Sequence, residues 1–165
     1  MSVDSMDKSR FPEPGEENGY LKDHADLLIR SFGRLTGTPL ISSQELEFSS
    51  AKYLFYAPFA LVSHDTSLDP IFTYANQTAL DLFEMTWKEF TAMASRYSAE
   101  PDLREDRRRL LQKVHDHGYI DDYSGIRIAK TGRRFRISRA VVWNLVDDNG
   151  SCHGQAACFH DWEFV

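Results

Sequence analysis

Cysteine and long apolar runs are both scarce in this 165-residue chain. Its two cysteines, Cys152 and Cys158, lie six residues apart on one expected strand. That spacing separates them by roughly 20 Å, too far for a disulfide. No stretch of about 18 apolar residues is present, so we expect no membrane-spanning helix. Met1 to Gly19 is polar and acidic and lacks the apolar core of a secretory signal. Free thiols without a signal predict a cytoplasmic protein.

Positive charge is also in short supply, with 19 Lys and Arg residues against 25 Asp and Glu and a formal net charge of −6. Nucleic-acid binding usually needs a basic surface, so it is not expected here. The segment around Arg104 to Lys113 is rich in arginine. Asp102, Glu105 and Asp106 are interleaved with these arginines, which indicates a solvated face of mixed charge.

Catalytic motifs are missing as well. The chain contains no Gly-x-Ser-x-Gly, no P-loop, no His-Glu-x-x-His and no dinucleotide fingerprint. His64 and Asp65 are adjacent in a turn, where a local hydrogen bond is the simpler interpretation. We therefore expect no enzyme and no catalytic residues. A small α+β enzyme stays as a weaker alternative that would need an acid–base pair in a cavity.

Hydrophobic residues make up 42% of the chain and aromatic residues 13%, which is enough for a core. The polar residues 1–19 are expected to be a disordered tail. Residues 20–57 are expected to form flanking helices. Apolar residues recur every three or four positions from Tyr20 to Leu35, which predicts one helix. Ser42 and Glu45 resemble a capping box for a second helix that ends near Phe55.

The remaining residues, 58–165, alternate strands and helices in a definite order. Two short strands, 59–63 and 71–75, form a predicted hairpin, and Asn76 is a suitable N-cap for the helix after it. Thr86 and Glu89 form a second possible capping box. A loop at 95–101 and a helix at about 102–117 follow, and then come strands 119–128, 133–146 and 152–162. This order predicts an α+β fold, in which helices cover one face of a five-stranded antiparallel sheet and enclose a small cavity.

The element order is that of a PAS domain, and the chain resembles MEKHA-domain proteins, a PAS-like family. That family is found alone in bacteria and plants, and at the C-terminus of plant class III homeodomain–leucine-zipper proteins. The resemblance covers about Tyr53 to Trp162. The segments that carry it are APFALVSHD (57–65), DPIFTYAN (69–76), SRYSAE (95–100), YSGIRIAKTGRRF (123–135), VWNLVDDNG (142–150) and GQAACF (154–159).

The resemblance implies a sensory or regulatory module that binds a small molecule or passes a signal to a partner chain. Flanking helices of PAS proteins commonly pack on the sheet or pair with a second copy, so a homodimer is expected. The alternative is a ligand-free module for protein interaction and dimerisation. An enclosed cavity of about 300 Å³ or more would favour a ligand, and a solid core would favour the alternative.

The cofactor of such a module stays unknown from the sequence. A flavin–cysteinyl photosite needs a cysteine in the segment matching Thr91–Arg109, which has none, so this photosite is not expected. Non-covalent flavin is left open. Haem is not favoured, because His115 and His117 suit exposed cations at a helix end. No metal site is expected, since Cys158 and His160 would need two further ligands.

Five residues are candidates for lining the cavity. Arg139 lies between Ile137 and Val141 on the apolar face of an expected strand, where a guanidinium needs a partner. That partner is either a carboxylate or phosphate ligand, or an internal salt bridge; a bulge could instead turn Arg139 outward. The other four candidates are Arg96 and Tyr97 on the loop that flanks the cavity, Tyr123 in the sheet, and Asn76, for which a structural capping role is the main expectation.

Overall fold

The computed structural model describes residues 11–42, 49–100 and 103–165. Residues 11–19, expected to be disordered, are held against the domain, and this part of the prediction is wrong. They contain a short 3-10 helix, η1 (Glu16–Asn18). The Trp87 indole N–H donates to the Phe11 carbonyl at 3.1 Å, and Lys52 pairs with Glu16 at 2.7 Å. The composition of this segment does not reveal these contacts, because the partners lie far away in the sequence.

Two helices flank the sheet domain on its N-terminal side. Helix α2 (Lys22–Thr36) ends at Gly37, whose φ of 76° suits glycine. Helix α3 (Ser50–Phe55) begins at Ser49, whose hydroxyl accepts from the Lys52 backbone N–H. The expected capping box at Ser42 and Glu45 involves Glu45, which lies outside the described residues.

The sheet has six strands: β1 (Ala60–His64), β2 (Phe72–Ala75), β3 (Tyr119–Ile128), β4 (Arg134–Val146), β5 (Cys152–Phe159) and β6 (Asp161–Phe164). All described pairings are antiparallel, in the order β2-β1-β5-β4-β3. The expected last strand, 152–162, is thus two strands. They share one side of β4, because β5 pairs with residues 141–146 and β6 with residues 135–138.

The joint between these two pairings is a bulge in β4 at Arg139. This residue has a φ of 54°, in the left-handed region, and its side chain is 78% exposed and pairs with Asp161 at 2.8 Å. The bulge shifts the alternation of side chains by one residue. Ile137 and Val142 therefore line the inner cavity, while Trp143 packs against Phe32 of α2. Of the possibilities stated for Arg139, the outward turn at a bulge is the one observed, and the prediction that Arg139 lines the cavity is wrong.

Helices α4 (Gln77–Phe83), α5 (Trp87–Phe90) and α6 (Arg104–His117) follow the first hairpin. The N-cap role of Asn76 and the capping box of Thr86 and Glu89 are confirmed. The expected loop at 95–101 contains a 3-10 helix, η3 (Ser95–Ser98). Helix α6 ends at Gly118, as expected.

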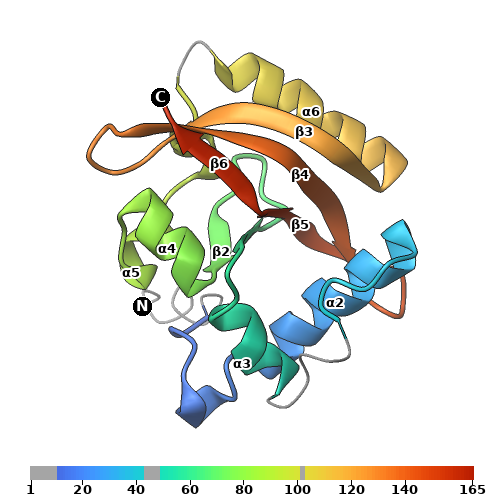
Figure 1. Ribbon diagram of the computed structural model, residues 1–165. Coiled ribbons are helices and arrows are strands. Elements are labelled where there is room, and N and C mark those ends of the chain that lie inside the picture. The colour runs from blue at the N-terminus through green and yellow to red at the C-terminus, as the bar shows by residue number, and fades with distance from the viewer. Residues whose placement is uncertain (1–10, 43–48, 101–102) are drawn as a thin grey trace, which may run out of the picture.

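The elements form layers with the sheet between α6 and α2 (Figure 1). Helices α4, α5 and α6 share one side, as the sequence predicts. Helix α2 covers the other side, where the rings of Phe32 and Trp143 meet edge-on at 4.9 Å. The α+β class with an antiparallel sheet is confirmed, with α2 as an added layer. Among the described residues, no helix is both long and apolar enough to cross a membrane.

A candidate ligand groove beneath helix α6

An open groove of about 860 Å³ lies between α6, the β1–β2 loop and the β4–β5 hairpin. The helix contributes Arg107 and Leu111. The last residue of β1 contributes His64, the loop after it Asp65, and the hairpin Gln155. Arg107, His64, Leu111 and Gln155 also line an inner cavity of about 50 Å³ between α6 and the sheet. The groove and the cavity therefore meet at these four side chains.

Arg107 is the most unusual member of this lining. It is 8% exposed, and its guanidinium donates one hydrogen bond, from Nη2 to the Ser95 hydroxyl at 2.7 Å. No carboxylate of the described residues pairs with it. Burial, and then the nearby charge of Arg127, lower the pKa of Arg107 to about 10. Arg107 is thus still charged at neutral pH.

His64 is a second buried polar group beside it. The Nδ1 atom of His64 contacts the Asp65 carbonyl oxygen at 3.0 Å, and because a carbonyl can accept but not donate, Nδ1 carries the hydrogen. Nε2 then carries no hydrogen and can only accept a hydrogen bond, and it is buried without a partner. Burial lowers the pKa of His64 to about 4, so the ring is neutral at pH 7. The Asp65 carboxylate accepts from the N–H groups of Ser67 and Ile71 instead.

The sheet floor of the groove is polar and is bonded directly to α6. The Gln155 amide donates to the Leu111 carbonyl at 2.9 Å and to the Asn144 side-chain oxygen at 3.1 Å. Asn144 in turn donates to the Val114 carbonyl at 3.1 Å. Beside them, a Cβ at Gly154 would lie 1.9 Å from the His64 carbonyl oxygen, so a glycine is needed where β5 passes this close. The position of α6 therefore depends on the β4–β5 hairpin.

The inner cavity is mostly apolar. Phe72, Phe83 and Ile137 line it together with Tyr123, whose hydroxyl accepts from Arg127 at 2.8 Å. Its volume is far below the ~300 Å³ of a typical drug-sized pocket. The inner cavity alone therefore offers space for a small group, and the open groove is the larger site.

The residues predicted from the sequence to line a cavity are spread over several places. Tyr123 lies in the inner cavity. Arg96 lies on the groove rim, where its Nε pairs with Asp69 at 3.0 Å. Tyr97 is 47% exposed and stacks against Arg96 and Arg104, outside both the groove and the cavity. Arg139 is on the surface, as described above.

Asn76 is fully buried and lies away from the groove, in a structural position. Its side-chain oxygen accepts from the backbone N–H groups of Leu61 and Ala79, and its amide donates to the carbonyls of Leu54 and Phe59. Asn76 thereby ties α3, β1 and α4 to one another.

Sequence reasoning missed Arg107, His64 and Gln155 as groove residues. For Arg107 a signal was available. It falls four residues after Leu103 and three before Leu110, within the apolar stripe of its helix. The exposed Arg108 and Arg109 beside it conceal this position in a run of arginines.

Two further sets of side chains bear on metal binding and on thiol chemistry. Within them, no three His, Cys, Asp or Glu side chains are grouped as metal ligands would be. Cys152 and Cys158 are both free thiols, and burial raises the pKa of Cys158 to about 12. His115 lies on the groove rim with an exposed side chain, 3.4 Å from Asp116.

Solved PAS and light-oxygen-voltage domains share this architecture. The PAS domain of a Colwellia psychrerythraea protein superimposes with a TM-score of 0.57 at 16% identity, covering 70% of this chain and 92% of that one. A light-oxygen-voltage domain studied with a flavin analogue gives a TM-score of 0.54 at 20% identity, covering 73% and 87%. At these identities the likeness establishes the fold, and the chain is a PAS-like α+β domain.

The particular family follows from the sequence itself. The MEKHLA domain model, the family spelled MEKHA above, matches residues 22–164, and the chain belongs to this family. Homeobox-leucine zipper protein ATHB-9 of Arabidopsis thaliana is 34% identical over 104 residues, which are 61% of this chain and 12% of that protein. HOX32 of Oryza sativa subsp. indica is 29% identical over 142 residues, which are 82% and 16%. The chain thus spans a small part of these relatives' length.

Proposed function

We propose that this domain is a ligand-responsive sensory module in which the state of the groove under α6 alters the packing of α2 on the sheet. One observation carries the proposal: the β4–β5 hairpin takes part in both sites. Asn144 and Gln155 of this hairpin hold α6 over the groove. Val146, two residues after Asn144 on β4, and the turn that follows it hold α2.

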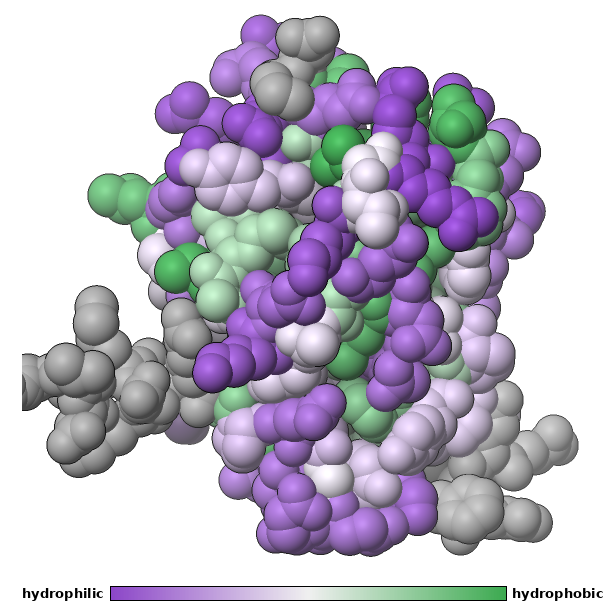
Figure 2. Space-filling model, turned by 90° about the vertical axis from the view of Figure 1, so that its left-hand side faces the viewer, coloured by the Kyte–Doolittle hydropathy of each residue, from purple (hydrophilic) through white to green (hydrophobic). Residues whose placement is uncertain are grey.

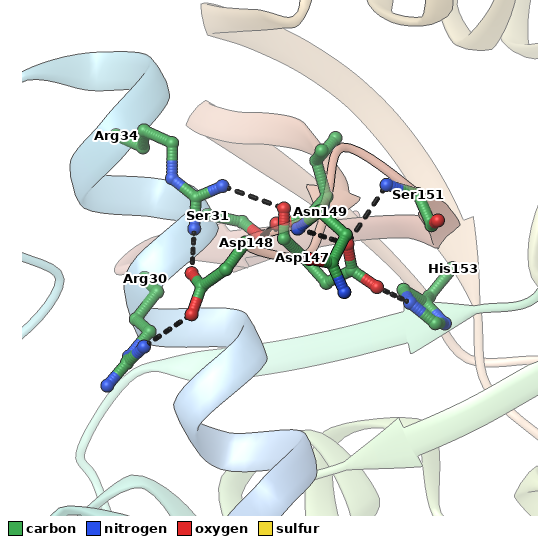
Figure 3. A network of polar contacts seen from close by, with 9 residues as sticks. Arg30, Ser31, Arg34, Asp147, Asp148, Asn149, Ser151 and His153 are labelled. Carbon is green, nitrogen blue, oxygen red and sulfur yellow. Dashed lines mark hydrogen bonds and ion pairs between the residues drawn. The ribbon is translucent and has the colours of Figure 1, made fainter.

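The end of β4 and the turn after it contact α2 through a network of polar interactions (Figure 3). The Ser31 hydroxyl donates to the Val146 carbonyl and accepts from the Val146 N–H, both at 2.9 Å. Asp148 pairs with Arg30 at 2.8 Å and with Arg34 at 3.0 Å. Ser31 is buried, whereas the ion pairs are exposed and contribute less to stability. A shift of the hairpin that follows binding would therefore reach α2 mainly through Ser31.

A ligand-free interaction module is the second candidate function. The observation that favours it is the inner cavity of about 50 Å³, too small for most ligands. The enzyme alternative has less support, because His64 bonds the backbone of Asp65 and not its carboxylate. The homodimer, the partner chain, the cytoplasmic location and the absence of nucleic-acid binding stay predictions.

A native mass spectrum of the freshly purified protein, compared with its denatured mass, tests the proposal. We expect a mass excess that disappears on denaturation. Hydrogen exchange should then differ between the purified and the ligand-stripped protein in both the groove and α2. A bare mass with no excess would favour the interaction module instead.

The variant Ser31→Ala tests the route to α2. It removes both bonds to Val146, so α2 should exchange faster, and the response of α2 to the ligand should be lost while protection of the groove is kept. Asp148→Asn is the matched control, because it weakens exposed ion pairs and leaves Ser31 in place. An α2 response that survives in Ser31→Ala would overturn this route.

A further inference from the structure

We propose that the groove binds a short-chain carboxylate that carries a hydroxyl or amino group. This inference rests on the proposed ligand-responsive function and names the chemistry of its ligand. The carboxylate would pair with Arg107, the hydroxyl or amino group would donate to His64, and the apolar end would enter the inner cavity.

The argument for a carboxylate begins with the charge of Arg107. A buried guanidinium is costly unless an anion pairs with it, and Arg107 makes one neutral hydrogen bond. The acidic side chains that line the groove are engaged elsewhere. Asp69 pairs with Arg96, Glu105 lies near Arg108 and Arg109, and Asp65 caps its own turn.

Arg127 makes this interior more positive. Its guanidinium donates to the Tyr123 hydroxyl and to the Ile126 carbonyl, and it has no carboxylate partner among the described residues. Arg134 and Arg139, by contrast, both have one, in Glu100 and Asp161. Both arginines that line the inner cavity, Arg107 and Arg127, thus lack a carboxylate partner among the described residues, and carboxylates match guanidinium geometry well.

The second, independent observation is the bare Nε2 of His64. It is a buried acceptor without a partner, at the junction of the groove and the inner cavity. A carboxylate alone could not satisfy it, because both groups accept. A hydroxyl or amino group on the same ligand would supply the missing hydrogen.

The size of the ligand follows from the inner cavity. At roughly 30 Å³ for a group the size of water, a volume of about 50 Å³ holds about two heavy atoms. Phe72 and Ile137 make this end apolar. A two-carbon tail fits this space, and a long acyl chain does not.

Calorimetric titration with three related probes tests each part of the proposal. The probes are 2-hydroxybutyrate, its neutral amide 2-hydroxybutyramide, and butyrate, which lacks the hydroxyl. We expect 2-hydroxybutyrate to bind about tenfold or more tightly than either of the other two. No binding of 2-hydroxybutyrate at about 10 mM, or equal binding of acid and amide, would overturn the proposal.

Two variants assign the contacts. Arg107→Gln should remove the preference for the acid over the amide, and His64→Leu should remove the preference for 2-hydroxybutyrate over butyrate. Arg109→Gln is the control, because Arg109 is a neighbouring arginine that does not line the groove and whose side chain is 76% exposed. Loss of the acid preference in Arg109→Gln, or its persistence in Arg107→Gln, contradicts the assignment.

The thermal stability of Arg107→Gln without any probe gives a readout that does not depend on the ligand. A buried arginine that serves ligand binding lowers the stability of the ligand-free protein. Arg107→Gln should therefore leave the Tm unchanged or raise it by about 2–4 °C. An arginine kept for the fold would lower the Tm on removal, and such a loss would overturn the proposal.

The outcomes also separate this inference from the proposed function. A neutral molecule found in the groove by native mass spectrometry, with a response in α2, would refute the carboxylate and support the sensory module. Binding of 2-hydroxybutyrate that depends on Arg107 but leaves the hydrogen exchange of α2 unchanged would support the carboxylate and refute the sensory mechanism.

Discussion

At the residue scale, Asn76 is the buried side chain on which the most backbone groups depend. It is 0% exposed and bonds four backbone groups, those of Leu54, Phe59, Leu61 and Ala79. Asn76→Ala would leave these groups without partners, in an interior that water does not reach. We expect a loss of at least about 3 kcal/mol in the free energy of unfolding, measured by urea denaturation.

Gln77→Ala is the control for this loss, because Gln77 is the next residue and its exposed amide bonds only to Asp81. It should cost less than about 0.5 kcal/mol. A similar loss in both variants would mean that the helix start, and not the buried network, determines the effect. The sequence predicts the cap on Ala79, which is local. The partners at Leu54 and Phe59 come from 17 to 22 residues away, beyond what local spacing can reveal.

Arg107 and Arg139 show the limits of periodicity in predicting which arginine lines the groove. Strand alternation predicts that Arg139 faces inward, but it assumes an unbroken strand, and one residue with a φ of 54° reverses the faces beyond it. Arg107 lies on an apolar helical stripe, but the charged residues next to it in the sequence make this position difficult to recognise. Periodicity identifies faces, and it fails where the backbone departs from the regular period.

At the element scale, the docking of α2 on β1 involves a buried histidine. His24 of α2 is 8% exposed, and a hydrogen bond of 2.9 Å joins its Nε2 to the Ser63 hydroxyl. Burial lowers the pKa of His24 from the ordinary value of 6.5 to about 4. The unfolded chain therefore binds a proton more readily than the folded one. The contribution of His24 to stability should be fully present well above pH 6.5 and be lost as the pH falls from 6.5 toward 4, by at most roughly 3 kcal/mol for this one residue.

Urea denaturation at a series of pH values measures this decrease, and His24→Gln identifies its source. The free energy of unfolding of this variant should depend less on pH between 6.5 and 4. His64 has the same lowered pKa, so His64→Gln should flatten the same window, and the double variant should do so most. The pKa of Glu89 lies at about 2, so its titration acts at lower pH. A slope unchanged in the double variant would contradict this account.

At the scale of the whole molecule, the order of elements was enough to predict the α+β class. Each short strand and each cap is encoded locally, by alternation and by residues such as Thr86. The sixth strand and the ordered segment at 11–19 were missed because both depend on distant partners. The face seen in Figure 2 is mostly hydrophilic, with hydrophobic residues in small patches rather than one continuous area.

The place of α2 also changes the argument for a homodimer. The sequence predicts a second copy because the apolar stripe of α2 needs a cover, and in the structure the chain's own sheet provides one. Phe32 is 8% exposed and meets Trp143, which is fully buried. A dimer would then use some other surface, and the stripe would stabilise each chain by itself.

Phe32→Ala tests whether this stripe acts within one chain. It should cost about 3–5 kcal/mol, and thermal unfolding should show the same loss of Tm at about 2 and about 200 µM protein, because folding within one chain does not depend on concentration. Leu68→Ala, at a fully exposed leucine, is the control and should leave the Tm nearly unchanged. A Tm that rises with concentration in the native chain, and no longer does so in Phe32→Ala, would show instead that α2 pairs with a second copy.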